Sequence, residues 1–296
     1  MRKTITRTAK RTVVVLSAVC AIALLASCGT KGEQSTMNGH NHHAMNMGNE
    51  HVHATGHSGH GGYAGSEPQA QAAFAFESGA ARANEETVIR IRITGADGTP
   101  VGKFEETHEK LLHFIAVDEG LTTFAHLHPK YEGKGVFTVA YRFPAGGKFK
   151  LFADFTPSGG GNQVSGAWVT VEGTKSPREE LKPDDRTVKT VGGTTVELSI
   201  GGAEAGKEAV LAYKLKDAAS GKDVVDLEPY MGAAGHVVIL SQDGERYLHV
   251  HPEDEKAKGP EARFMTSFPA SGLYKAWAQF QRHGQVVTVP YTIRVN

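Results

Sequence analysis

The chain has 296 residues, which is enough for two domains of ordinary size, each with its own hydrophobic core. Its 32 basic and 32 acidic residues balance, but five of the basic residues and none of the acidic ones lie in residues 1–27. The remainder therefore carries a net charge near −5. This acidic balance gives no reason to expect nucleic acid as a partner.

Residues 1–27 have the layout of a secretory signal, with a basic start and an apolar run from Val13 to Ala26 that is too short for a comfortable membrane span. The sequence around Cys28, Leu25-Ala26-Ser27-Cys28-Gly29, resembles a bacterial lipobox. This resemblance implies cleavage before Cys28 and lipidation of its sulfur. We therefore expect an extracytoplasmic lipoprotein, anchored to a membrane at the cell surface or periplasmic face. The alternative is an ordinary signal peptide with an incidental cysteine.

The only other cysteine, Cys20, lies in the segment that would be removed. With Cys28 lipidated, the protein would have no free thiol and no disulfide, so a metal ion would have to be held by nitrogen, oxygen or thioether ligands.

Residues 28–73 are poor in bulky apolar side chains and rich in Gly, Asn, Ser and His, which predicts a disordered tether. Imidazole and thioether together suit copper, Cu(I) especially, whereas histidine alone equally suits zinc or nickel. We therefore expect loose metal binding here, against the alternative of an inert spacer. The side chains in question are His40, His42, His43, His51, His53, His57, His60, Met37, Met45 and Met47.

Residues 74–172 are expected to form a first β-sandwich domain, since short alternating or β-branched segments are separated by Gly- and Pro-containing turns. About seven short strands in roughly a hundred residues is typical of an immunoglobulin-like sandwich. The predicted strands are Phe74–Phe76, Thr87–Thr94, Leu111–Val117, Thr122–His128, Gly135–Phe143, Lys148–Phe155 and Ala167–Val171.

Residues 173–186, with two prolines and dense mixed charge, are interpreted as a linker. After it the same order of elements returns in residues 187–296, at an offset of 122 to 125 residues. For example, Phe268-Pro269 corresponds to Phe143-Pro144, and 273–280 to 148–155. The fold class predicted is thus all-β, two tandem immunoglobulin-like β-sandwich domains after a tether.

A His-x-His-Pro motif occurs once in each domain, at His126 and His128 and again at His249 and His251. Alternation along a strand places both histidines of each pair on one face. A further histidine lies 13 residues upstream in both domains. This repeated spacing favours metal ligands over isolated structural histidines, although imidazoles bonding across the sandwich remain the alternative.

The first set of candidate ligands is His108, His113, His126 and His128, with Asp154 as an oxygen ligand or as the partner of a bound imidazole. The repeat alignment gives the second set as Met231, His236, His249 and His251, with Gln279 opposite Asp154. A site with a thioether and an amide is softer and less anionic, so the second site should favour Cu(I) more than the first. His283 has no counterpart and is expected at the surface.

Enzyme motifs fit poorly, and we expect no enzymatic activity. His108 and His113 are five residues apart, so they would not share a face on a zinc-protease helix. The sequence has no G-x-S-x-G motif, and its glycine-rich stretches lack the Lys-Ser/Thr ending of a phosphate loop.

Four motifs resemble those of secreted bacterial tandem β-sandwich proteins associated with copper and other heavy-metal resistance. They are the His-Glu-Lys-x-x-His run at 108–113, Phe-x-His-x-His-Pro at 124–129, the Phe-Pro turn at 143–149, and the Gln-Phe hairpin at 279–284. The chain is also similar in kind to periplasmic copper carriers of the CopC class. The resemblance implies a metal-resistance or metal-transport protein as a partner.

These observations predict copper sequestration or delivery through histidines on β-strands. Zinc or nickel binding by the same residues is one alternative. A cell-surface structural or interaction module with structural histidines is another.

Overall fold

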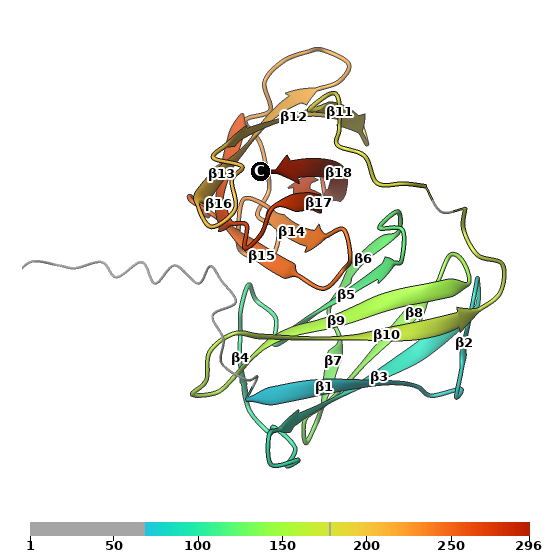
Figure 1. Cartoon of the computed structure of the whole chain (residues 1–296). Coiled ribbons are helices and arrows are strands. Elements are labelled where there is room, and N and C mark those ends of the chain that lie inside the picture. Colours follow the sequence, from blue (N-terminus) through green and yellow to red (C-terminus); the bar gives the residue numbers. More distant parts are fainter. Residues whose placement is uncertain (1–68, 178) are drawn as a thin grey trace, which may run out of the picture. The chain divides into compact units, whose positions relative to one another are not determined.

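The computed structural model describes residues 69–177 and 179–296, all of which fall within one compact unit. These residues form an all-β protein of two immunoglobulin-like sandwich domains (Figure 1). The described part of the chain includes no helix long and apolar enough to cross a membrane. The expected signal segment, Cys28 and the His/Met-rich tract lie outside the described residues.

The first domain contains two sheets, drawn from blue to yellow-green in Figure 1. One has the strand order β1-β3-β8-β7, and the other the order β2-β10-β9-β5-β6, with β4 paired to β9. The strands are β1 (Ala70–Phe76), β2 (Ala81–Arg82), β3 (Glu86–Gly95), β4 (Phe104–Glu105), β5 (Leu112–Asp118), β6 (Phe124–Leu127), β7 (Lys130–Gly133), β8 (Val136–Arg142), β9 (Gly147–Pro157) and β10 (Gln163–Glu172).

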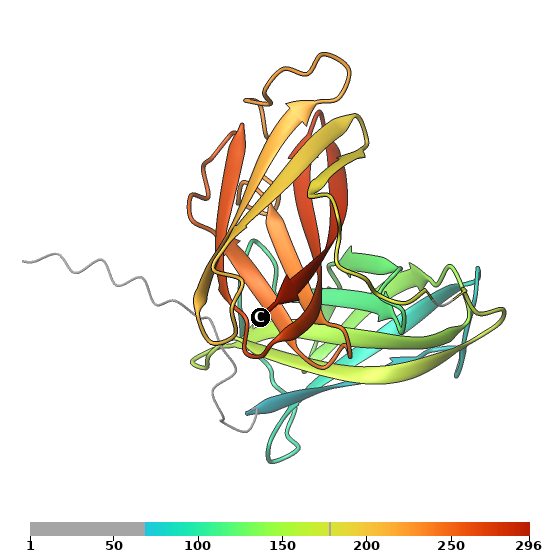
Figure 2. The same cartoon turned by 45° about the horizontal axis from the view of Figure 1, so that its top comes forward.

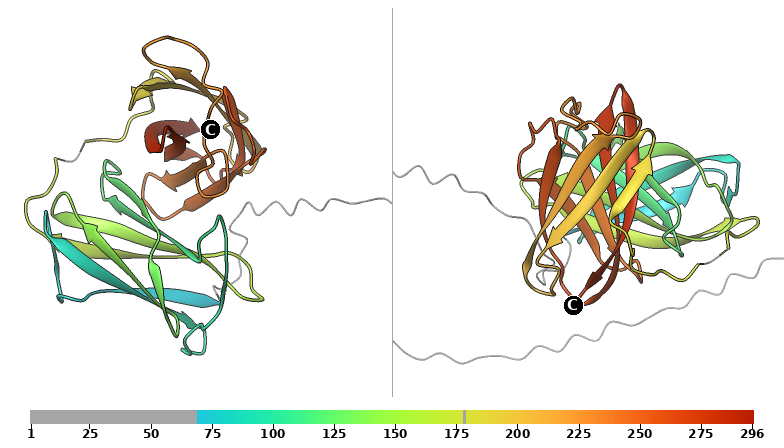
Figure 3. Two further views of the ribbon diagram at one scale, coloured as in Figure 1. Left: turned by 180° about the vertical axis from the view of Figure 1, so that it is seen from behind. Right: turned by 90° about the horizontal axis from the view of Figure 1, so that it is seen from above.

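The second domain, drawn from yellow to dark red in Figure 2, follows one continuous strand order, β11-β12-β13-β16-β15-β14-β17-β18. Strand β15 joins its two halves because it pairs with both β14 and β16. Figure 3 shows these strands wrapping around their own core. They are β11 (Val188–Val191), β12 (Thr194–Gly201), β13 (Glu208–Asp217), β14 (His236–Ser241), β15 (Tyr247–Pro252), β16 (Glu261–Ser267), β17 (Gly272–Arg282) and β18 (Gln285–Val295).

Strand register shows that the two domains repeat one another. In the first domain His113 lies opposite Asp154, and in the second His236 lies opposite Gln279. The pairing of β5 with β6 likewise recurs in β14 and β15, where Val238 lies opposite His249. The duplication expected from sequence therefore extends to individual residue pairs.

The central strand of each domain is buried on both faces. On β5, Phe114 and Ala116 point into the first domain's core, whereas Ile115 and Val117 point the other way. On β14, Val237 and Ile239 belong to the second core, while Val238 and Leu240 point out of it.

The outward residues of both strands share a third hydrophobic cluster, which we call the interdomain cluster. Its buried members are Ile115, Val117, Leu121, Phe152, Val238, Leu240, Tyr247 and Trp277. The two sandwiches therefore contact each other through these outward faces. His113 and His236 lie on the same faces, near the beginning of β5 and of β14.

The strand bounds differ from the sequence expectations at a few points. Strand β1 begins at Ala70, before the expected start at Phe74, because residues 70–73 also pair with β3. These residues are small and give little apolar alternation, so the sequence pattern did not indicate a strand there. Strands β2 and β4 have two residues each and β7 only four, too few to produce a periodic pattern. The segment before β11 is anchored, because Gly146 N donates to the Thr174 carbonyl oxygen.

Candidate metal centre

Three of the histidines expected as ligands lie together in the first domain. His113, His126 and His128 each offer one ring nitrogen, and these nitrogens all lie within 4.8 Å of one another. We call them the histidine triad. The ring centroids of the triad are 5.0 to 5.3 Å apart.

Strand pairing brings the triad together. On β5, His113 lies two residues before Ile115, and Ile115 is paired with His126 on β6. Residues two apart share a face, so His113 and His126 meet on the outward face of this sheet. His128 follows two residues later, just beyond the end of β6.

Hydrogen bonds to carbonyl oxygens fix the proton positions on two of these rings. The Nε2–H of His113 donates to the Thr107 carbonyl oxygen at 2.9 Å. The Nδ1–H of His126 donates to the side-chain oxygen Oε1 of Gln279 at 2.7 Å, with Gln279 Nε2 turned to the Thr288 hydroxyl at 3.1 Å. An imidazole in its neutral form carries one N–H, so the other nitrogen of each ring can then accept a hydrogen bond or bind a cation.

The two remaining ring nitrogens face each other. Nδ1 of His113 lies 3.0 Å from Nε2 of His126. Two lone pairs at this distance repel unless a proton or a cation is shared between them. Nitrogens bound tetrahedrally to a zinc- or copper-sized ion at about 2.0 Å are about 3.3 Å apart, so only a small movement would admit an ion.

His128 supplies the third nitrogen of the triad. Its Nε2 is buried and has no hydrogen-bond partner among the described residues. Burial, assisted by the nearby His113 and Lys110, lowers the pKa of His128 to about 4. The ring is therefore neutral at pH 7 and its lone pair is available to a metal ion.

Asp154 lies opposite His113 in the pairing of β5 with β9. Its Oδ1 accepts a hydrogen bond from Asn162 Nδ2 at 2.7 Å, and its Oδ2 accepts one from the Tyr247 hydroxyl at 3.3 Å. Because Tyr247 belongs to the second domain, these bonds place Asp154 at the contact between domains. A role for Asp154 as an oxygen ligand stays a prediction.

His108 and Met231 occupy equivalent two-residue turns. Both have left-handed backbone conformations, with φ of 51° and 52°. The residues after them, Glu109 and Gly232, have φ of 62° and 74°. Each turn is closed by paired backbone hydrogen bonds between its flanking residues, the pattern of a type I′ turn.

These two turns also face each other across the interdomain contact. A methyl group added at Gly232 would lie 3.4 Å from Glu109 Oε1. A left-handed conformation costs a non-glycine residue about 1–2 kcal/mol, so His108 and Met231 are held in place by their surroundings.

His236 is the second domain's counterpart of His113 and is fully buried on β14. Its ring centroid lies 4.6 Å from that of His108 and 6.4 Å from that of His113. The structure thus brings His236 to the first domain's histidines. His249 and His251 belong to β15 by backbone, but their side chains lie outside the described part of the structure.

His283 lies away from these rings, as expected. Its side chain is 71% exposed, and its Nε2 lies 3.4 Å from Asp226 Oδ2. It therefore offers a control position for histidine substitutions.

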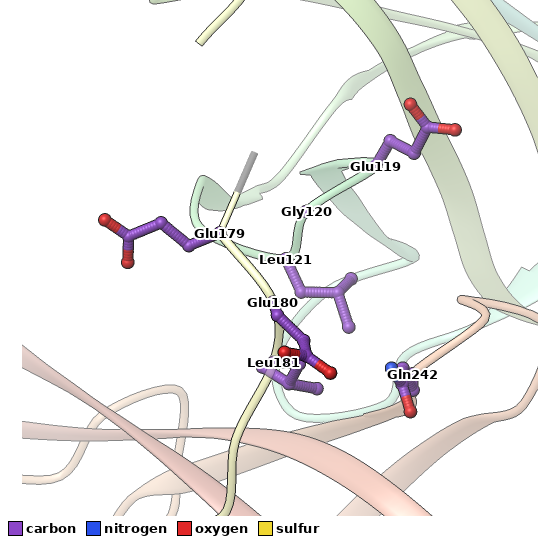
Figure 4. Close-up of a pocket in the computed structure, with 7 residues that line it drawn as sticks. All are labelled: Glu119, Gly120, Leu121, Glu179, Glu180, Leu181 and Gln242. Carbon is purple, nitrogen blue, oxygen red and sulfur yellow. The ribbon is translucent and has the colours of Figure 1, made fainter. Parts of the chain in front are cut away.

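A separate pocket contains no histidine. Figure 4 shows the carboxylates of Glu119 and Glu179 pointing in different directions, so the two do not converge on one ligand. The residues lining it are Glu119, Gly120, Leu121, Glu179, Glu180, Leu181 and Gln242.

Two residues at the site were not expected from sequence. Thr107 contributes only a carbonyl oxygen, which leaves no signal in the sequence. A contact of the Tyr247 kind could have been inferred. The continuous apolar sequence of β5 indicates a strand that is covered on both faces, and the outer face must then be covered by residues from outside the first domain's own core.

A family model matches the chain over residues 68–173 and 189–296, and its description is "Domain of unknown function (DUF8832)". The chain belongs to the DUF8832 family. Each matched DUF8832 segment spans one sandwich, so the family model recognises both repeats. A comparison with curated proteins gave no match.

Solved structures similar to this DUF8832 chain include a tetra-tandem repeat from the extending region of a large adhesion protein, with 10% identity and a TM-score of 0.26 over 77% of this chain and 49% of that one. Invasin, a bacterial integrin-binding protein, has 14% identity and a TM-score of 0.24, covering 75% and 39%. The Yersinia pseudotuberculosis adhesin InvE has 11% identity and a TM-score of 0.25, covering 76% and 59%.

The chain thus spans about half the length of these solved chains. Identities and TM-scores this low carry no argument about function.

Proposed function

We propose that this protein binds a transition-metal ion through the histidine triad, with copper as the first candidate. The observation that carries the proposal is the pair of ring nitrogens of His113 and His126 that face each other at 3.0 Å, with each ring oriented by a hydrogen bond on its far side. Metal-bound histidines characteristically donate their other N–H to a carbonyl or carboxylate. The unpaired Nε2 of His128 adds a third donor.

Three neutral imidazoles suit copper, zinc and nickel alike. Copper comes first because the N-terminal tract mixes histidine with methionine, and Met231 adds a thioether in the second domain. The protein would sequester copper or deliver it to a metal-transport or resistance protein. Histidine ligands suit this role, because each imidazole binds through a single nitrogen and can be exchanged individually.

The sequence around Cys28 supports a lipid anchor and an extracytoplasmic location for this activity. Globomycin-sensitive processing of the expressed chain, together with loss of membrane association in Cys28→Ser, would test the anchor. A Cys28→Ser protein that fractionates like the unchanged chain would contradict it.

The test of metal binding needs a chain in which the tract cannot contribute. The tract-silent chain is the full sequence with serine at His40, His42, His43, His51, His53, His57 and His60, and leucine at Met37, Met45 and Met47. Metal stoichiometry and Kd would be measured by competition with a chromophoric chelator, separately for Cu(I), Cu(II) and Zn(II). The account predicts stoichiometric binding at the folded domains.

Replacing His126 and His128 by alanine in this background should weaken binding at least about 100-fold, because two of three donors are removed. The matched control is His283→Ala, which should leave the Kd unchanged. Tighter binding of zinc than of either copper ion would identify the zinc alternative.

A second candidate is an interaction module whose histidines are structural. The contacts that favour it are the hydrogen bond from His126 to Gln279 and the interdomain cluster, since both join the two domains. This candidate predicts that the His126 and His128 double variant loses stability but that its metal affinity equals that of the unchanged tract-silent chain.

A further inference from the structure

Aromatic pairs show that the two domains contact each other through equivalent faces. Phe124 of the first domain stacks on Trp277 of the second, with ring centroids 4.7 Å apart and planes 13° apart. Phe152 of the first domain contacts Tyr247 of the second at 5.1 Å. In the repeat alignment Phe124 corresponds to Tyr247, and Phe152 corresponds to Trp277.

Exchanging the two domains therefore converts one aromatic pair into the equivalent of the other. This is the defining property of a two-fold contact, in which residue i meets residue j and residue j meets residue i. The two domains associate like the subunits of a symmetric dimer, although one chain supplies both.

A residue near such an axis lies close to its own counterpart. His113 and His236 are counterparts, and their ring centroids are 6.4 Å apart. The ring of His236 is also 6.3 Å from that of His126. The second domain thus places a fully buried imidazole at the edge of the triad.

The position of His236 fits a fourth ligand. The triad rings are 5.0 to 5.3 Å apart, so His236 is only about 1 Å farther from His113 and His126 than they are from each other. Tetrahedral coordination needs one donor beyond the triad, and an ion drawn between the four rings would satisfy it. His236 lies outside the group of ring nitrogens within 4.8 Å of one another, so it would have to move toward the triad by this difference when the ion binds.

We propose that His236 is a ligand of the same ion as the triad, so that one metal ion bridges the two domains. This inference rests on the proposed function, and it replaces two independent sites by one shared site at the axis. Its consequence is that occupancy stabilises the docking of one domain on the other, because ligands from both are needed for full affinity.

X-ray absorption at the metal edge of the tract-silent chain, loaded with one equivalent of Cu(II) or Zn(II), counts the bound imidazoles without any change to the domains. Four imidazoles are expected in the unchanged chain and three in His236→Gln, together with a Kd at least about tenfold weaker. Tyr230→Phe is the matched control. It keeps an aromatic ring 5.6 Å from the His236 ring and removes only a hydroxyl group that is not among the proposed ligands.

Three imidazoles and an equal Kd in both chains would overturn the bridge and leave the triad intact. Four imidazoles in both would also overturn it, because another residue would then be the fourth donor. Failure of the tract-silent chain to bind any ion stoichiometrically would instead overturn the proposed function itself. If His236→Gln does not fold, a count of three imidazoles in the unchanged chain overturns the bridge, and a count of four that persists in His108→Ala, whose ring lies 6.1 Å from that of His113, supports it.

Discussion

The Nδ1 atom of His113 and the Nε2 atom of His126 lie 3.0 Å apart, while the other nitrogen of each ring donates to a carbonyl oxygen. The acceptor for His126 is Gln279, which belongs to the other domain. The orientation of the His126 ring, a proposed ligand, is thus determined by the second domain. This relationship makes the triad sensitive to changes outside the domain that contains it.

Replacement of Gln279 by methionine should therefore weaken metal binding by the triad. The substitution keeps the volume but removes the acceptor that holds the Nδ1 proton of His126, and loss of such a partner typically costs about 10–100-fold in affinity. Chelator competition in the tract-silent chain would measure it. Gln281→Met, which removes only a bond to Glu228, is the control and should have no effect on Kd. An unchanged Kd in Gln279→Met would show that the tautomer is set by something else.

Glycine at position 109 should stabilise the protein, because Glu109 has a φ of 62° and its counterpart Gly232 already has glycine at 74°. Relief of the left-handed strain should raise the free energy of unfolding by about 1 kcal/mol. Gly232→Ala should have the opposite effect, since it adds left-handed strain, while the new methyl group would make only an ordinary contact with Glu109 at 3.4 Å. Urea unfolding of both variants measures the two changes in the free energy of unfolding. Destabilisation by Glu109→Gly would reveal a contact of the Glu109 side chain that matters more than its backbone.

Truncation of Trp277 should separate the domains more easily than truncation of Trp168. Trp277 is buried in the interdomain cluster and stacked on Phe124, so Trp277→Ala should lower the free energy of unfolding by about 3 kcal/mol or more. Trp168 is 38% exposed and also reaches the second domain, but through a peripheral hydrogen bond from its Nε1 to Glu245 Oε1 at 3.0 Å, so Trp168→Ala should cost less, about 1 kcal/mol. Equal losses measured by urea unfolding would contradict a larger contribution of the buried Trp277 to the contact between domains.

The metal-free protein should lose stability as the pH falls from about 6.5 toward 4. Burial lowers the pKa of His128 from 6.5 to about 4 in the folded state, so over this range the unfolded chain binds more protons at this residue. The contribution of His128 is therefore fully present above pH 6.5 and diminishes below it. His128→Gln should flatten the pH dependence of urea unfolding in the presence of a chelator. A steeper dependence in that variant would reverse the sign assigned to His128.

The sequence predicted the fold class and the duplication well, because both depend on local signals. Alternating segments, turn residues and the two His-x-His-Pro motifs at His126 and His249 are visible without any long-range information. The triad could be predicted as a group for the same reason, since β5 and β6 are neighbours in the chain and the spacing of His113 and His126 reflects one hairpin.

The arrangement between the domains could not be predicted in the same way. Sequence alignment made His113 and His236 equivalent but left open whether the folded domains hold one site or two, because equivalence does not say that the two residues lie near a common axis. The pairing of Phe124 with Trp277 depends on how two finished surfaces fit, and no local pattern encodes that fit. The continuous apolar character of β5 was the one available indication that its outer face is covered.

The triad is proposed to form a metal site in the folded domains, and the ion stoichiometry of the tract-silent chain tests this proposal. We expect one tightly bound Cu or Zn ion per chain, lost when His126 and His128 are replaced by alanine and retained in His283→Ala. A tract-silent chain that is folded but binds no ion more tightly than its His126 and His128 double variant would contradict it.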